Sequence, residues 1–242
     1  MIVRDMSVQA LQPKRVIATI ESLRNRIEVR LPGRNLVGIA EDVQQIARQA
    51  AERSNAFSQP NVKLRVAIGI LVVTLVIALI YIVYHLRFTS ADAWDVISGI
   101  EAGISCLVFM GVTMIFLITL EGRVKRKRAL DAIHELRVLA HIIDMHQLSK
   151  DPERLLGRYE ITDVSPNPDL SPFLLSRYLD YCSELLSLIG KIAVIYAQDY
   201  QDAVVLNAVN EIEVLTTGLS RKIWQKIMIL EQDELDRPKV QS

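Results

Sequence analysis

The segment HELRVLAHIIDMHQLSK, residues 134–150, holds the side chains best suited to chemistry. Three of the chain's four histidines, His134, His141 and His146, lie in it, with Asp144 among them. Imidazole and carboxylate groups can bind a metal ion or transfer protons. The segment therefore has three interpretations: a metal site, a catalytic site, or the polar face of a helix.

Helical spacing separates these interpretations. His134 and His141 are seven residues apart, which places them nearly above one another and roughly 10 Å apart along a helix axis. Two ligands on one helix share a metal best at a spacing of about four residues. His134 and His141 are therefore not expected to share an ion, and a site at His141 and Asp144 would need a ligand from another helix.

We predict no metal and no cofactor in this segment. The favoured interpretation is a polar helix face that packs partly against other helices. The alternative is a polar network that fixes helix register, formed by His134, Arg137, His141 and Asp144.

Catalytic and nucleic-acid functions lack support elsewhere in the chain. No nucleophile elbow, Cys–His pairing or glycine-rich phosphate loop accompanies the histidines, so we expect no enzymatic activity. Cys106 and Cys182 lie far apart and suggest no disulfide framework. Lys and Arg balance Asp and Glu to a formal charge of zero, so no basic field favours nucleic acid.

Two uncharged apolar runs indicate a membrane protein. They are VAIGILVVTLVIALIYIVY, residues 66–84, and AGISCLVFMGVTMIFLITL, residues 102–120. A helix of this length crosses the hydrocarbon layer, and in lipid only a helix satisfies the backbone of such a run. We predict a transmembrane hairpin with spans at about 66–86 and 99–120 and a short outer loop at 87–98.

Basic residues near the spans predict the orientation. The sequence EGRVKRKR follows the second span, whereas the loop RFTSADAWDVISGIE is acidic. Both termini are therefore expected in the cytosol, and the protein in the cell (inner or plasma) membrane as a multi-pass protein. The basic residues, which would also contact lipid headgroups, are Arg123, Lys125, Arg126, Lys127 and Arg128.

Glycines in the second span predict close helix packing. Gly99 and Gly103 form a G-x-x-x-G pattern, and Gly111 continues the same general side. Small residues let helix backbones approach one another in lipid, which suits either the hairpin or an oligomer.

Amphipathic patterns predict cytosolic helices on both sides of the hairpin. Apolar residues recur at three- and four-residue spacing before the membrane, and LPGRN interrupts them. Ser171 before Pro172 signals another helix start. A final long pattern predicts an interaction stripe that includes Ile212, Leu219, Ile223 and Ile227.

The expected fold class is all-α, a two-span hairpin with a cytosolic helical domain of the bundle or coiled-coil type. The expected segments are N-terminal amphipathic helices (1–62), the transmembrane hairpin (63–121), a basic juxtamembrane helix (122–150), a proline-containing linker (151–172), a C-terminal helical hairpin (173–234) and a tail (235–242).

The expected function is that of a non-enzymatic integral membrane protein acting as a helical scaffold, oligomerisation or interaction module. The alternatives are a membrane signal transducer and a small pore-forming oligomer. The expected partners are the lipid bilayer and, through the cytosolic helices, a second copy or another protein; nucleic acid is not expected.

Overall fold

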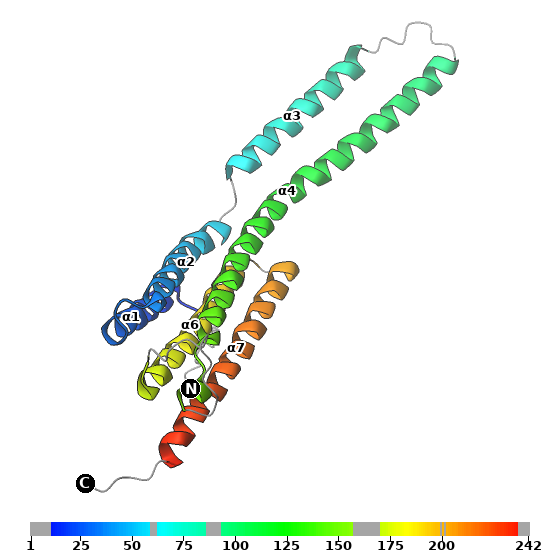
Figure 1. Ribbon diagram of the computed structural model, residues 1–242. Helices are drawn as coiled ribbons and strands as arrows, with labels where there is room; N and C mark the ends of the chain where they lie inside the picture. Colours follow the sequence, from blue (N-terminus) through cyan, green and yellow to red (C-terminus); the bar gives the residue numbers. More distant parts are fainter. Residues whose placement is uncertain are drawn as a thin grey trace, which may run out of the picture. The chain divides into compact units, whose positions relative to one another are not determined.

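The computed structural model describes residues 11–58, 62–85, 93–156, 170–198, 200 and 202–236, and these residues form helices and no strand (Figure 1). The predicted all-α class is confirmed at this level. The helices are α1 (Pro13–Arg30), α2 (Asn35–Ser58), α3 (Val62–His85), α4 (Ala93–Leu148), α5 (Pro152–Leu155), α6 (Pro172–Gln198) and α7 (Ala203–Asp236).

The chain divides into two compact units. One unit contains Met1–Ser58 and Ala129–Ser242, and the other contains Gln59–Arg128. Helix α4 contributes to both, because its 56 residues run from the second unit into the first without a break. We call the first of these units the bundle.

Local sequence signals explain where the bundle helices begin and end. Pro13 stands at the start of α1, where a missing N–H costs nothing. Gly33 has a φ of 71°, a left-handed conformation that glycine adopts without strain, and it reverses the chain between α1 and α2. The Ser171 hydroxyl accepts a hydrogen bond from the Leu174 N–H at 3.3 Å and caps α6.

The N-terminus of α7 is also capped by a side chain. The Asp202 carboxylate accepts hydrogen bonds from the backbone N–H groups of Val204, at 3.0 Å, and Val205, at 3.3 Å. These N–H groups have no partner within the helix, and the negative charge also suits a helix N-terminus. The cap therefore fixes the turn that brings α7 back along α6.

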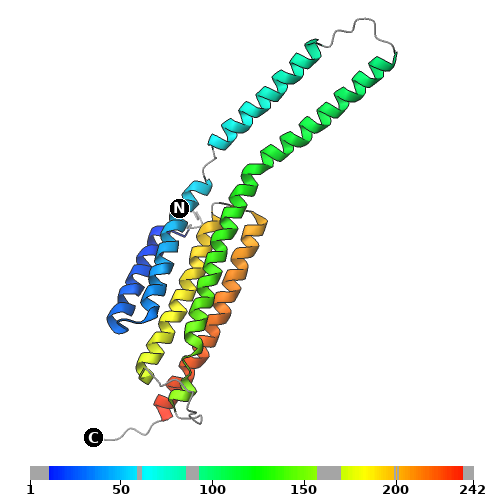
Figure 2. The same ribbon diagram turned by 45° about the horizontal axis from the view of Figure 1, so that its top comes forward.

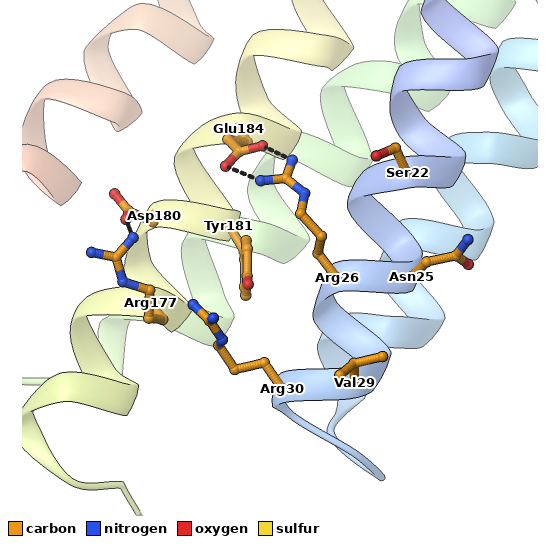
Figure 3. A pocket seen from close by; sticks show the side chains of 9 residues that line it. All are labelled: Ser22, Asn25, Arg26, Val29, Arg30, Arg177, Asp180, Tyr181 and Glu184. Carbon is orange, nitrogen blue, oxygen red and sulfur yellow. Dashed lines mark hydrogen bonds and ion pairs between the residues drawn. The ribbon is translucent and has the colours of Figure 1, made fainter.

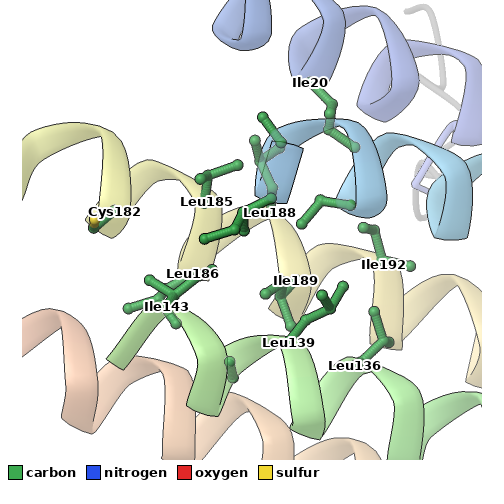
Figure 4. Packing of buried hydrophobic residues seen from close by; sticks show 14 of the residues in the cluster. Ile20, Leu136, Leu139, Ile143, Cys182, Leu185, Leu186, Leu188, Ile189 and Ile192 are labelled. Atoms are coloured by element: carbon green, nitrogen blue, oxygen red, sulfur yellow. The ribbon is translucent and has the colours of Figure 1, made fainter. Parts of the chain in front are cut away.

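Helix α6 lies at the centre of the bundle. It packs against α1, α2 and α7 (Figure 2), and its apolar residues are buried on most of its circumference. Figure 4 shows Leu139 and Ile143 of α4 pointing toward Leu186 and Ile189 of α6. Such dispersed apolar burial is the main stabilising contribution in a helical domain.

The second unit has the opposite distribution of apolar side chains. In α3 the side chains of Ile77 and Tyr81 are exposed, and in the first part of α4 so are Leu107 and Phe109. Among the described residues, one helix is long and apolar enough to cross a membrane, in the part of α4 from Gly103 to Leu148, and none of its apolar window is buried. The two-span hairpin remains a prediction.

Several predicted segments fall outside the described residues. They are the first half of the outer loop, at 87–92, most of the proline-containing linker, at 157–169, and the tail from residue 237.

Candidate functional site

The histidines of the opening segment lie on the surface of α4. His134 and His141 are exposed, and His146 is half-buried. A shallow groove of about 420 Å³ between α2 and α4 has His134, Glu135 and Asp42 in its lining. Nevertheless, no three His, Cys, Asp or Glu side chains in the described part of the chain are arranged to hold a metal ion.

The charged residues near these histidines have partners elsewhere. The Arg137 guanidinium pairs with the Glu211 carboxylate of α7 at 2.5 Å. Asp144 accepts a hydrogen bond of 2.6 Å from the Gln147 amide, three residues along the same helix. Arg137 therefore ties α4 to α7, and the structure places His134 and His141 outside both interactions.

A second polar cluster, not predicted from the sequence, lies at the C-terminal end of α4. The Lys226 ammonium of α7 donates hydrogen bonds to the backbone carbonyls of Gln147, at 2.8 Å, and Lys150, at 3.1 Å. The last carbonyls of a helix have no partner within it and carry partial negative charge. Lys226 therefore caps α4 from a neighbouring helix, and we call this contact the α4 joint.

Burial controls the protonation of the groups around the α4 joint. Burial lowers the pKa of Lys226, an effect that the nearby carboxylates of Asp151 and Asp144 oppose. Burial also raises the pKa of the Cys182 thiol to about 12, against the opposing effect of Lys226. The pKa of Tyr178 is raised, first by burial and then by Cys182.

These shifts determine what the cluster can do chemically. A thiol becomes a nucleophile only as a thiolate, and Cys182 is protonated at neutral pH. Cys182 is fully buried and Tyr178 nearly so, so neither group is presented to a substrate. The arrangement suits a joint that holds the end of α4 against α6 and α7.

A third feature is a groove between α1 and α6, about 470 Å³ in volume (Figure 3). Across it, the Arg26 guanidinium makes two hydrogen bonds to the Glu184 carboxylate, at 3.2 and 2.5 Å, and lies 5.8 Å from the centre of the Tyr181 ring. Arg177 pairs with Asp180 at 2.9 Å on one side. Arg30 extends from α1 toward α6 on the other side of the groove.

The predicted interaction stripe on α7 is buried within the chain. Ile212 and Ile223 are fully buried, and Leu219 and Ile227 nearly so. Helix α7 packs against α6, so these side chains form part of the bundle core. A partner that used them would have to replace contacts within the chain.

The predicted lipid and span residues lie in or near the second unit. Four of the basic residues are exposed, Arg123, Arg126, Lys127 and Arg128, while Lys125 is half-buried and pairs with Glu121 at 3.1 Å. Gly103 and Gly111 have open space at the position of an added Cβ. What surrounds Gly99 lies outside the described residues.

Long-range pairing explains why the sequence did not reveal the α4 joint or the groove. Lys226 lies 79 residues from Gln147, and Arg26 lies 158 residues from Glu184. One local signal exists: Lys226 adjoins the apolar positions Ile223 and Ile227, where a lysine needs a polar partner.

Comparison of the chain with protein-family models, curated proteins and solved structures found no match.

Proposed function

We propose that this chain is a non-enzymatic integral membrane protein that anchors a helical interaction module to the cell (inner or plasma) membrane. Helix α3 and the first part of α4 form a transmembrane hairpin, and both termini lie in the cytosol. The bundle then acts as a scaffold for a second copy or another protein.

The observation that carries this proposal is the change of environment along α4. In its first part, Leu107, Phe109 and Ile115 are exposed, whereas beyond Ala129 the residues Leu136 and Ile143 are fully buried. Exposed apolar side chains over several turns are costly in water and favourable in lipid. One continuous helix is therefore suited to join a bilayer to a folded bundle.

The chemistry of the bundle supports interaction over catalysis. At the α4 joint the half-buried Lys226 binds backbone carbonyls, and the fully buried Cys182 thiol has a raised pKa, so neither group is presented to a substrate as a reactive group. The groove between α1 and α6 is lined by three arginines together with Tyr181. Arginine and aromatic side chains of this kind are enriched where proteins bind one another.

A transducer is the second candidate, because α4 belongs to both units. A rigid helix can carry a displacement from one end to the other. Deleting residues 88–92 of the predicted outer loop should then change hydrogen exchange at the C-terminal amides of α4. Unchanged exchange there would leave the anchor as the better description.

Alkaline carbonate extraction of native membranes tests the anchoring. The full chain should stay in the membrane pellet, because spanning helices are not released by removing electrostatic contacts. Release into the supernatant would contradict the proposal. Chemical cross-linking in the same membranes, followed by mass spectrometry, then reports self-association and other protein partners together.

A further inference from the structure

The groove between α1 and α6 combines arginines, one of which pairs with no carboxylate among the described residues, with exposed apolar side chains. On its α1 wall the lining positions Ser22, Asn25, Arg26, Val29 and Arg30 repeat at three- and four-residue spacing, and on its α6 wall Arg177, Asp180, Tyr181 and Glu184 do the same. Each wall is thus one face of a helix over about two turns. A groove with two such helical walls can accommodate an extended or helical peptide segment.

The charges of this groove do not balance. Glu184 is engaged by Arg26, and Asp180 by Arg177. Arg30 is exposed and contacts an aromatic ring, and the described part of the chain provides it no carboxylate partner. Three arginines against two carboxylates leave one positive charge, and a guanidinium fork binds a carboxylate in two parallel hydrogen bonds.

Two of the arginines converge on one ring. The guanidinium carbons of Arg30 and Arg177 lie 5.9 and 5.8 Å from the centre of the Phe173 ring. Both guanidinium groups therefore lie beside the same ring and attract an anion there, with Arg177 already sharing the Asp180 carboxylate at 2.9 Å. Burial has also left the Arg177 Nε without a hydrogen-bond partner.

Exposed apolar side chains beside these arginines indicate that the ligand also has an apolar part. Val29 is 85% exposed and Phe173 60% exposed, so a ligand that covers them gains by removing apolar surface from water. A net charge of +1 in the groove is small for a polyanion such as a nucleic acid, which is bound through several positive charges. One surplus positive charge on the groove instead suits a ligand that carries one or two carboxylates next to an apolar side chain.

We propose that the groove between α1 and α6 binds an acidic segment of a partner protein, with Arg30 and Arg177 gripping a carboxylate and Val29 and Phe173 covering an adjacent apolar side chain. This inference rests on the proposed function, since it names the kind of partner that the interaction module recruits. The ion pair between Arg26 and Glu184 holds α1 to α6 and so maintains the shape of the groove.

The test uses the full chain in detergent micelles and a synthetic amphipathic peptide with glutamate and leucine at helical spacing. Two further probes are compared with it. One is the same peptide with every glutamate replaced by glutamine, and the other is inorganic pyrophosphate. The glutamate peptide should bind, and Arg30→Ala and Arg177→Ala should each weaken binding about tenfold, as expected for the loss of a charged hydrogen bond.

Arg15→Ala is the matched control, because Arg15 is exposed on the same helix and outside the groove. It removes the same charge and should change the affinity less than about twofold, the effect of a distant screened charge. Equal losses in all three variants would overturn the proposal, as would equal binding of the glutamine peptide or preferential binding of pyrophosphate. Circular dichroism of each variant confirms that the bundle is folded.

Failure of this test is distinguishable from failure of the proposed function. If the chain stays in the membrane pellet after carbonate extraction and cross-links to a partner away from the groove, the acidic-segment proposal is wrong and the anchored interaction module stands. If the chain is extracted, the proposed function is wrong whatever the groove binds.

Discussion

The Lys226 ammonium of α7 lies 2.8 Å from the carbonyl oxygen of Gln147 in the last turn of α4. This contact holds the C-terminal end of a helix whose other end is exposed and apolar. Together with the Arg137–Glu211 ion pair, it holds the bundle part of α4 against α7.

Loss of the Lys226 ammonium should weaken the bundle. Lys226→Met keeps most of the aliphatic stem but removes the ammonium donor from the carbonyls of Gln147 and Lys150, which should cost about 1–3 kcal/mol. Thermal unfolding in detergent micelles, followed by circular dichroism, should show a midpoint several degrees lower. Lys222→Met, at an exposed position one turn earlier, should have little effect; equal shifts in the two variants would count against the joint.

Alkaline pH should destabilise the bundle through Cys182. Its pKa is about 12 in the folded protein against an ordinary value of 9.0, so the folded state binds the proton more tightly than the unfolded state. The stabilisation is fully present below about pH 9 and is lost as pH rises toward 12. The pH dependence of the unfolding midpoint measures it.

Cys182→Ala removes this titration and should flatten the loss between pH 9 and 11, although the small cavity lowers stability at neutral pH by about 1 kcal/mol. The lowered pKa of Lys226 acts in the opposite direction, because there the unfolded state binds the proton more tightly. A slope that is identical in wild type and Cys182→Ala would show that the thiol is not the responsible group.

A charge placed in the buried stripe of α7 should disrupt packing. Leu219 is 5% exposed in the core, and Leu219→Asp buries an unpaired carboxylate at a cost of several kcal/mol. Lys222→Asp, on the exposed side of the same helix, should change stability by about 0.5 kcal/mol or less. Chemical unfolding of the full chain in micelles compares them, and similar stabilities would mean that the stripe is not a packing surface.

The histidines of α4 should bind no metal in stoichiometric amount. His134 and His141 are exposed and seven residues apart, and Asp144 is engaged by Gln147. Elemental analysis of the purified chain should therefore find no transition metal at one ion per chain. Stoichiometric zinc that disappears in His141→Ala would reverse this conclusion.

Local patterns allowed much of the bundle to be predicted. The interruption at Pro32 and Gly33 separates α1 from α2, and Ser171 caps α6, because turn and cap chemistry depends on neighbouring residues alone. Three- and four-residue spacing also placed Ile212 and Leu219 on one face of α7, which the structure buries.

Pairing between helices was beyond such patterns. Nothing near Arg137 in the sequence distinguishes Glu211 as its partner over the closer Asp144, because the choice depends on how α7 packs beside α4. The same holds for the convergence of Arg30 and Arg177 on Phe173. An amphipathic stripe predicts that a helix packs but does not identify the helix that it packs against.

The accessibility of two engineered cysteines tests the membrane hairpin most directly. In a Cys106→Ala background, Ser90→Cys lies in the predicted outer loop and Ser242→Cys at the C-terminus. With intact cells and a membrane-impermeant maleimide, Ser90→Cys should be labelled, and Ser242→Cys should react only after the membrane is permeabilised. Labelling of Ser242→Cys from outside, with Ser90→Cys protected, would contradict the account.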